Sequence, residues 1–400
     1  MRMNRERLQI GAYCLAPYAH TMEHVREIAE CGIDVMLCVP NDRALLDKLA
    51  DQGVGAVVSG AVPGWFGGQG EQAGQMAIQN PLEEYERAAR QFEDHPAVWG
   101  IDIGDEPSSL DFPHYGKVFD CVRRLFPNQF PYLNLYPGYA MVPWNTPEEK
   151  AFQLGTSDYA EYIERYCRSV ASDYICFDFY PYAADVEGFL SNLHTVSEAC
   201  RKYGRSLWVV LQVNSHRPEV WTSENRMRFQ AYAAMAFGAE SIFWACYTAG
   251  WWYHQVLDEQ GNRTEQYDKL RRVNGELHGL GAEYMKFRCV KTHIIDGEPL
   301  DTGTFRQVCA EDGERLIVGE MASRCDDGRT ALMICAAGDP QDEHPHKARI
   351  HFKSSKRIRA FGGAGEIEIT PEAGGGGSLA VESCAGVLLT CGNGCNSGLG

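Results

Sequence analysis

The 400-residue sequence has no hydrophobic run long enough to cross a bilayer, and it is poor in basic residues. Lys and Arg number 37 against 54 Asp and Glu, which gives a formal net charge of -17. Nucleic acids and anionic membrane surfaces are therefore not expected as partners, because both require a cationic face. The first residues also lack an apolar signal region with a small-residue cleavage site, so we expect a cytoplasmic protein.

Familiar metal and cofactor motifs are missing as well. The chain has no CxxC pair and no HExxH run, and the spacing from Cys391 to Cys395 lies in a glycine-rich tail without histidine. No glycine-rich dinucleotide fingerprint follows the first predicted strand. The 15 cysteines are odd in number and mostly lie inside apolar runs, which predicts reduced core thiols. We therefore expect neither a metal nor a cofactor.

What the chain does have is an alternation of short apolar runs with longer amphipathic segments up to residue 285. This is the pattern of βα units around a parallel sheet. The predicted strands cover residues 8–14, 33–39, 54–59, 98–103, 132–136, 174–179, 207–213 and 241–247. Eight such units in about 280 residues predict a (β/α)8 barrel, a TIM barrel, over residues 1–285.

From residue 286 the character changes to short strands separated by turns. The predicted strands cover residues 290–295, 305–310, 316–321, 330–336, 348–352, 358–360, 366–370 and 378–390. We expect a small all-β sandwich over residues 286–392 and a disordered tail over 393–400. Because residues 286–400 contain neither Trp nor Tyr, the sandwich is expected to pack against the barrel rather than to bind sugars.

The fourth predicted strand ends in two adjacent carboxylates, Asp105 and Glu106, which Pro107 follows. Two neighbouring acids at a strand end repel each other and are partly desolvated, so at least one pKa should rise. In a barrel of this kind the chemistry lies at the carboxyl ends of the strands. Glu106 is therefore the predicted general acid.

Other strand ends carry amides, acids and aromatic rings, which are the groups that bind sugars. Asp178 lies near the end of the sixth strand and is the first candidate for a second carboxylate. The predicted substrate-binding residues are Tyr13, Trp65, Asn134, Tyr136, Tyr180, Gln212, Asn214, Trp244, Tyr247 and Trp251. A carbohydrate is the expected substrate.

With these residues the chain resembles the clan A glycoside hydrolases, (β/α)8 retaining glycosidases with a general-acid glutamate at the end of strand 4. The similarity covers about residues 8–285. It rests on residues 99–107, 177–182, 208–212, 228–232, 236–239 and 244–247. The resemblance implies that Glu106 is the acid/base, and a trailing β-sandwich is common among such barrels.

The sequence departs from the clan pattern at two positions. Asp105 replaces the asparagine that usually precedes the acid, and Gln212 replaces the nucleophilic glutamate expected on strand 7. An amide cannot form a glycosyl ester. Three hypotheses remain: Asp178 or the loop acid Glu219 supplies the second carboxylate, Asp105 and Glu106 act in a substrate-assisted N-acetylhexosaminidase, or the barrel is a non-catalytic sugar binder.

A metal-dependent sugar isomerase or lyase on the same barrel is a further alternative. Such enzymes use Asp, Glu and His as metal ligands. His216 is the one clear histidine at a strand end, which is too few for a typical ligand set. The sequence leaves open whether the chain forms a homo-oligomer.

Overall fold

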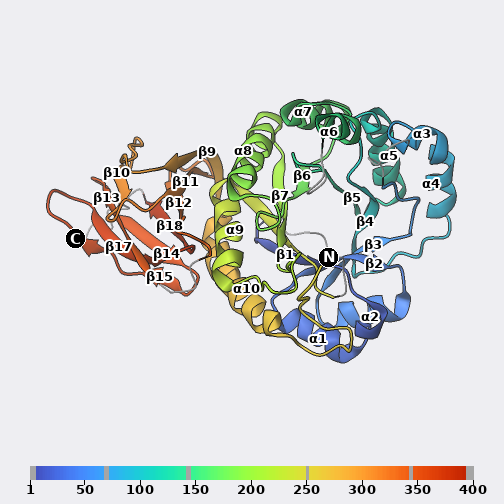
Figure 1. Cartoon of the computed structure of the whole chain (residues 1–400), viewed down its shortest axis with the longest axis horizontal. Helices are drawn as coiled ribbons and strands as arrows, with labels where there is room; N and C mark the ends of the chain where they lie inside the picture. Colours follow the sequence, from blue (N-terminus) through green and yellow to red (C-terminus); the bar gives the residue numbers. More distant parts are fainter. Residues whose placement is uncertain (1–5, 67–71, 141–145, 249–251, 342–345, 393–400) are drawn as a thin grey trace, which may run out of the picture. The chain divides into compact units, whose positions relative to one another are not determined.

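The computed structural model describes residues 6–66, 72–140, 146–248, 252–341 and 346–392 (Figure 1). Packing divides the chain into two compact units. The first contains Gln9–Trp221 and Ser241–Asp268, and the second contains Thr222–Glu240 and the chain from Lys269 onward. The domain boundary at residue 285 follows a change of sequence character and stays a prediction, and the predicted tail lies outside the described residues.

Eight parallel strands form a nearly closed barrel, which confirms the predicted fold class. The strands are β1 Gln9–Tyr13, β2 Val35–Pro40, β3 Gly55–Ser59, β4 Val98–Asp105, β5 Phe130–Asn134, β6 Tyr174–Asp178, β7 Ser206–Gln212 and β8 Ala239–Ala245. Their order in the sheet is β5-β4-β3-β2-β1-β8-β7-β6. A parallel bridge between Leu135 and Phe177 joins the two edge strands just beyond β5. The carboxyl ends of the strands therefore converge on one mouth.

Helices follow the strands along the chain, and α1 to α8 lie around the outside of the sheet (Figure 1). The helices are α1 Met22–Glu30, α2 Arg43–Asp51, α3 Met76–Gln79, α4 Leu82–Ala89, α5 Phe112–Leu125, α6 Pro147–Leu154, α7 Tyr159–Ser169, α8 Val186–Tyr203, α9 Glu224–Ala236 and α10 Glu265–Tyr284, with a 3-10 turn η1 at Pro17–Ala19. Side-chain caps mark several starts: Asp42, Asp158 and Ser223 each accept a backbone N–H of the first turn.

The barrel interior is filled with aromatic rings rather than mainly with branched aliphatic chains. Tyr174 and Trp208 stack with ring centroids 3.7 Å apart, and Tyr132 lies parallel to Tyr174 at 6.4 Å. Gly55 makes room for this layer, because a Cβ there would lie 2.2 Å from the indole of Trp99. The rings close the barrel below its mouth, so a substrate can approach only the groups above them.

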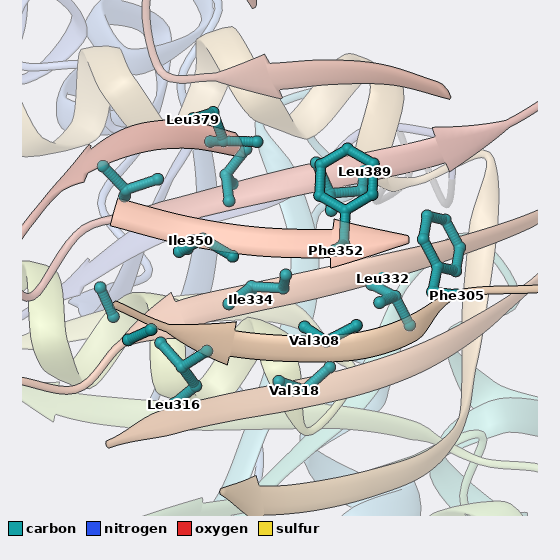
Figure 2. Packing of buried hydrophobic residues seen from close by; sticks show 14 of the residues in the cluster. Phe305, Val308, Leu316, Val318, Leu332, Ile334, Ile350, Phe352, Leu379 and Leu389 are labelled. Atoms are coloured by element: carbon teal, nitrogen blue, oxygen red, sulfur yellow. The ribbon is translucent and has the colours of Figure 1, made fainter. Parts of the chain in front are cut away.

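The chain beyond α10 forms two antiparallel sheets. One has the order β10-β13-β17-β16 and the other β15-β14-β18-β12-β11-β9. The strands are β9 Phe287–Ile295, β10 Arg306–Ala310, β11 Leu316–Ser323, β12 Thr330–Ala336, β13 Lys347–Lys353, β14 Ile358–Gly362, β15 Gly365–Ile367, β16 Thr370–Pro371, β17 Gly377–Glu382 and β18 Gly386–Cys391. Figure 2 shows apolar side chains of both sheets, among them Val318 and Ile350, meeting in a shared core. This is the predicted sandwich.

The segment predicted as one long strand, residues 378–390, is two strands. A turn separates β17 from β18: Cys384 has a φ of 65°, and the N–H of Ala385 donates to the carbonyl of Glu382. The two strands belong to different sheets. Apolar residues lie on both sides of Glu382 and Ser383, so the prediction joined two strands across a turn that these two polar residues mark.

Helix α9 belongs to the same compact unit as the sandwich and is buried around its circumference, including Gln230. Its backbone comes very close to β11: a Cβ on Gly319 would lie 2.2 Å from the carbonyl oxygen of Ala236. A Cβ on Gly386 of β18 would lie 2.2 Å from the ring of Tyr232. Glycines therefore permit the close packing of sheet on helix.

We predict that Gly319→Ala destabilises this unit. The added methyl meets a backbone carbonyl that cannot move aside, and overpacking of this kind costs about 1–3 kcal/mol. The midpoint of thermal unfolding should fall by several degrees. Gly303→Ala is the matched control, because a Cβ at Gly303 meets no atom within 4 Å. Equal midpoints for the two variants would contradict the packing described here.

Candidate active site

The end of β4 is shaped to present Asp105 and Glu106 at the barrel mouth. Gly104 has a φ of 139°, and a Cβ there would lie 2.3 Å from the carbonyl oxygen of Trp65, so glycine is required. The N–H of Asp105 donates to that carbonyl at 2.9 Å, and the N–H of Glu106 donates to the carbonyl of Asn134 at 3.0 Å. Glu106 itself has a φ of 44°, a left-handed conformation that these bonds hold in place.

A buried tyrosine ties this strand end to its neighbour. The hydroxyl of Tyr162, on α7, donates to the carbonyl of Pro107 at 2.8 Å and accepts the N–H of Tyr136 at 3.3 Å. Tyr162 is fully buried. The same side chain thus holds the segments that follow β4 and β5. These two hydrogen bonds restrain the backbone on the carboxyl side of Glu106.

Three carboxyl groups meet at the mouth. The side-chain N–H₂ of Asn134 donates to Asp105 at 3.1 Å and to Asp178 at 2.8 Å, so one amide bridges two acids. The carboxyls of Glu106 and Asp178 are hydrogen-bonded directly to each other, and the side chain of Tyr180 also hydrogen-bonds Asp178. Asp178 is 4% exposed, whereas Asp105 and Glu106 are partly exposed. The predicted acids of β4 and β6 therefore form one cluster.

The surroundings raise the pKa values of Asp105, Glu106 and Asp178 by different amounts. Burial raises the pKa of Asp178 only to about 6, because hydrogen bonds from Asn134, Tyr180 and Glu106 favour its ionised form. Burial, and then the charge of Asp178, raises the pKa of Asp105 to about 8. Burial and the charges of Asp178 and Asp105 raise the pKa of Glu106 well above its usual range. The surroundings therefore favour the protonated form of Glu106 and leave Asp178 the more readily ionised of the two.

Several predicted substrate-binding residues lie in this cluster. Asn134 bridges the acids. Burial raises the pKa values of both Tyr136 and Tyr180, and the charges of Glu106 and Asp178 raise them further. Tyr13 lies lower in the barrel, where its hydroxyl is hydrogen-bonded to that of Tyr132.

Other predicted residues hold the loops of the mouth. Gln212 accepts the N–H of Tyr182 at 3.2 Å and donates to the carbonyl of Asn214 at 3.0 Å. The side chain of Asn214 donates to the carbonyl of His254 at 3.2 Å and accepts the N–H of Cys246. Gln212 thus joins the loops after β6 and β7 where a strand-7 nucleophile was expected.

The side chain of Trp65, a predicted sugar-binding residue, points to the start of α5. Its indole N–H donates to Asp111 at 3.3 Å, and its carbonyl accepts both the N–H of Asp105 and the hydroxyl of Tyr115. It therefore supports the end of β4 through its backbone, while its side chain fixes the loop after β3.

The structure does not bring Trp244 and Tyr247 to the acids. Phe243 and Ala245 face the barrel interior, so Trp244 between them points to the outer face of β8, where it is fully buried. The hydroxyl of Tyr247 is buried beside Cys31 and Tyr267. Glu219 and His216 lie on the loop after β7, Glu219 exposed, and Trp251 lies outside the described residues.

Sequence reasoning missed two tyrosines near Asp178. The charge of Asp178 raises the pKa of Tyr139, whose hydroxyl accepts the N–H of Tyr180 at 3.3 Å. It also raises the pKa of Tyr159, whose hydroxyl is buried with no hydrogen-bond partner. Tyr159 opens α7, far from any strand end in sequence, so only the folded chain reveals it.

Sequence reasoning also missed an acid, Asp102, which lies in β4 three residues before Asp105. Its carboxylate accepts Ser59 Oγ at 2.6 Å and the N–H of Gly104 at 3.0 Å. Burial raises its pKa, and these hydrogen bonds oppose the rise. An acid inside an apolar strand was the sequence feature that could have identified Asp102. The prediction used the adjacent pair at the strand end instead.

The raised pKa values predict that stability falls as pH rises. Between the unfolded pKa of about 4 and the folded value of about 8, the unfolded chain has released a proton that Asp105 still holds. Ionisation therefore favours unfolding, and the contribution present below pH 4 is lost towards pH 8. Asp105→Asn should raise the unfolding midpoint at pH 8 by a few degrees and have less effect at pH 5. Asp120→Asn, exposed on α5, is the control and should shift neither value.

Within the parts of the chain that the structure describes, no three His, Cys, Asp or Glu side chains are arranged to hold a metal ion. The described residues therefore offer no set of metal ligands for the metal-dependent isomerase or lyase considered above. The helices of those same parts include none that is long and apolar enough to cross a membrane. All fourteen cysteines at described positions are free thiols.

The fold and the cluster define a (β/α)8 barrel with a carboxyl site at the mouth. No family model matches the sequence, and no curated protein matches it. In structure, 96% of the chain is similar to 85% of a cycloisomaltooligosaccharide glucanotransferase from Paenibacillus sp., with a TM-score of 0.58 and 8% identity.

Two further solved structures are similar over about two thirds of the chain. Xylanase 10B from Thermotoga petrophila matches 68% of this chain and 94% of its own, with 14% identity and a TM-score of 0.46. A family 5 mannosidase from Rhizomucor miehei matches 69% and 94%, with 11% identity and a TM-score of 0.42. With a TM-score of 0.58 and 8% identity, the similarity to the glucanotransferase shows that the fold is shared.

Proposed function

We propose that the protein is a glycoside hydrolase in which Glu106 is the general acid/base and Asp178 the second carboxylate. The observation that carries the proposal is the close approach of these two carboxyls from β4 and β6, in surroundings that favour the proton on Glu106 and leave Asp178 the more readily ionised. Two acids whose environments separate their pKa values are suited to opposite roles in one reaction. The pair comes from β4 and β6, so the amide at Gln212 does not prevent it.

The contact favours a double displacement. Inverting enzymes hold their carboxyls about 6.5–9.5 Å apart to leave room for a water molecule, whereas retaining enzymes hold them about 5–5.5 Å apart. Glu106 and Asp178 are close enough to share a hydrogen bond, so their spacing is nearer to that of the retaining enzymes. Glu106 would give its proton to the departing glycosidic oxygen, which replaces Asp178 as its acceptor. Asp178 would attack the anomeric carbon and form a glycosyl ester. Glu106 would then take a proton from the water that cleaves this ester.

The remaining groups of the cluster serve this chemistry. Asn134 and Tyr180 hydrogen-bond Asp178, which keeps it ionised and oriented. Among the charged groups, other acids have the largest influence on Glu106. A neutral sugar therefore fits this mouth better than a uronic acid, whose carboxylate would be repelled.

Carbohydrate as the substrate class also has support from the comparison over nearly the whole chain. The Paenibacillus glucanotransferase, whose structure contains cycloisomaltoheptaose, shares the fold at a TM-score of 0.58. Its identity to this chain is 8%, so the sugar, the anomer and the linkage do not transfer.

A substrate-assisted reaction is the second candidate. Asp105 is partly exposed, adjoins Glu106 and is hydrogen-bonded by Asn134, which places it to orient an N-acetyl group. Its pKa of about 8 would leave it protonated near neutral pH, able to donate to the acetamide oxygen.

A screen of the full-length protein against nitrophenyl glycosides tests the proposal. The panel should pair each plain hexoside with its N-acetyl form, and each active substrate should be repeated with Glu106→Gln. Activity on plain hexosides that Glu106→Gln lowers, and lowers further on the matching alkyl glycosides, supports the double displacement. Activity restricted to N-acetylhexosaminides, with inhibition by a thiazoline analogue, supports the second candidate. Sugar binding without turnover would identify a non-catalytic barrel and overturn both.

A further inference from the structure

Three thiols lie close to the carboxyl ends of neighbouring barrel strands. Cys14 directly follows β1, Cys246 directly follows β8, and Cys38 lies inside β2. All three pack on the aromatic layer of the barrel interior. Cys14 and Cys38 are partly exposed, whereas Cys246 is 2% exposed. The proposed glycosidase mechanism uses none of them.

The backbone turns Cys14 towards this layer. Tyr13 faces the barrel interior, so the alternation of a regular strand would direct the next side chain outwards. Instead Cys14 has a φ of 64°, a left-handed conformation that is uncommon for a residue with a Cβ. Its N–H donates to the carbonyl of Leu37 at 3.1 Å, and its carbonyl accepts Thr248 Oγ1 at 2.9 Å. A costly backbone conformation held in this way points to a use for the thiol.

The strand register places Cys14 beside Cys246. The parallel pairing of β1 and β8 ends with Ala12 opposite Trp244, so two residues further along the two cysteines are level. A hydrogen bond of 2.8 Å from the N–H of residue 247 to the carbonyl of residue 13 continues the pairing. Paired strands lie about 4.7–4.9 Å apart, within the range of about 4.4–6.8 Å between Cα atoms that a disulfide requires. The two side chains are also close enough to share a hydrogen bond.

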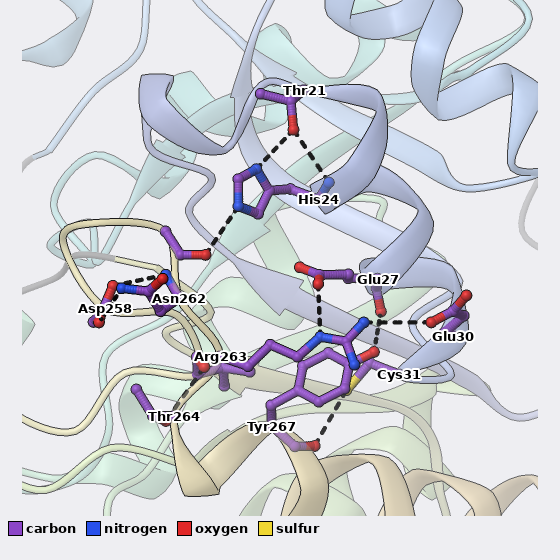
Figure 3. A network of polar contacts seen from close by, with 12 residues as sticks. Thr21, His24, Glu27, Glu30, Cys31, Asp258, Asn262, Arg263, Thr264 and Tyr267 are labelled. Carbon is purple, nitrogen blue, oxygen red and sulfur yellow. Dashed lines mark hydrogen bonds and ion pairs between the residues drawn. The ribbon is translucent and has the colours of Figure 1, made fainter.

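The segments that follow the two thiols are tied to each other by a network of polar contacts (Figure 3). Nε2 of His24, on α1, contacts the carbonyl of Gly261 at 2.9 Å. Arg263 donates to Glu27 of the same helix at 2.6 Å, and its guanidinium lies 4.2 Å from the ring centre of Tyr267. These contacts restrain the first and last strands of the barrel against separation. The two thiols therefore stay within reach of each other.

The surroundings make Cys14 the most nucleophilic thiol of the three. The hydrogen bond with Cys246 lowers the pKa of Cys14, although burial opposes this effect. Burial, and then the charge of Asp102, raises the pKa of Cys38, whose Sγ lies 3.9 Å from that carboxylate. The thiolate is the form that attacks a disulfide. A partly exposed thiol of lowered pKa beside a second, buried thiol is the arrangement of a redox-sensitive pair.

We propose that Cys14 and Cys246 form a thiol pair that a small uncharged disulfide oxidises, so that a new S–S bond links β1 to β8. The sulfur of Cys14 attacks one sulfur of the external disulfide, whose S–S bond breaks and releases a thiolate. The sulfur of Cys246 then attacks that of Cys14 and releases the second thiolate. The two cysteine protons pass to these thiolates. The protein thus loses two electrons and two protons, and the external disulfide becomes two thiols.

The charge of the mouth determines which oxidant reacts. The charges of Asp105 and Cys14 interact, as do those of Asp102 and Cys38. The resulting negative field repels an anionic oxidant such as glutathione disulfide and leaves an uncharged one unaffected. The new bond would join the first strand of the barrel to the last, which constrains the unfolded chain. The oxidised protein should therefore unfold at a higher temperature than the reduced one.

Incubation of the full-length protein with dithiodiethanol, an uncharged disulfide, tests the inference. After alkylation of the remaining thiols, trypsin separates Cys14 in residues 8–26 from Cys246 in residues 229–263, and each peptide has one cysteine. We expect mass spectrometry to show these two peptides linked, and dithiothreitol to separate them. Glutathione disulfide should form the link more slowly. The midpoint of thermal unfolding should rise by several degrees on oxidation.

Cys14→Ser and Cys246→Ser should each abolish both the linked peptide and the rise in the midpoint. Cys38→Ser is the matched control, because it removes the third thiol of the cluster and should keep both effects. A link from Cys14 to Cys38, or a stable mixed disulfide at Cys14, overturns the inference. So does an equal rise of the midpoint in Cys14→Ser, which would place the effect at another thiol. Faster reaction with glutathione disulfide would overturn the assignment of an uncharged oxidant.

Discussion

Replacing Glu106 by Gln is expected to lower kcat on glycosides with poor leaving groups by about 10²–10⁴, the usual contribution of a general acid. Gln keeps the size of the side chain but has no acidic proton for the departing oxygen. The free energy of unfolding should not fall, because burial and the charge of Asp178 already disfavour an ionised Glu106. Steady-state kinetics and thermal unfolding of the full-length variant measure the two effects.

The leaving group offers an internal control for this variant. A nitrophenolate departs without protonation, so Glu106→Gln should lose less activity on nitrophenyl glycosides in the glycosylation step than on alkyl glycosides. In the native protein, activity should fall at alkaline pH as Glu106 loses its proton. Near-native turnover of an alkyl glycoside by Glu106→Gln would remove Glu106 from the mechanism.

Replacing Asp178 by Ala is expected to abolish detectable hydrolysis of all glycosides, because the proposed covalent intermediate cannot form. The space vacated beside Asn134 and Tyr180 should admit a small anion. Added azide should therefore restore part of the activity on nitrophenyl glycosides and yield a glycosyl azide of inverted anomeric configuration.

The native reaction gives an independent measurement of the same claim. Proton NMR of the first product should show retention of the anomeric configuration, as two successive displacements require. The acidic limb of the pH profile should follow Asp178, whose pKa is about 6. Inversion of configuration, or hydrolysis by Asp178→Ala without azide, would contradict the nucleophilic role.

The architecture was predictable because its signals are local. Apolar runs, glycines behind helices and turn residues recur along the chain, and the eight observed barrel strands lie within about two residues of the predicted ones. The failure at residues 378–390 has the same origin. Apolar residues lie on both sides of the turn at Cys384, and pattern alone cannot show that the chain passes there from one sheet to the other.

The candidate site was predictable where a strand end supplies the side chain directly. Asp105, Glu106 and Asp178 were found this way, since parallel strands of a barrel all end at one mouth. Trp244 shows the limit of that reasoning. One residue along a strand reverses the direction of the side chain, so Trp244 is buried on the outer face although it lies near the end of β8.

The sequence by itself thus determined the barrel, the sandwich and the position of an acid pair, because periodicity and strand ends are written in consecutive residues. Only the tertiary structure decided that Glu106 meets Asp178, that Gln212 is held by Tyr182 and Asn214, and that Tyr159 approaches the acids. Those facts depend on backbone turns at Gly104 and Glu106 and on contacts between segments far apart in the chain. Hydrogen bonding and desolvation act through space, and no local pattern records which groups they bring together.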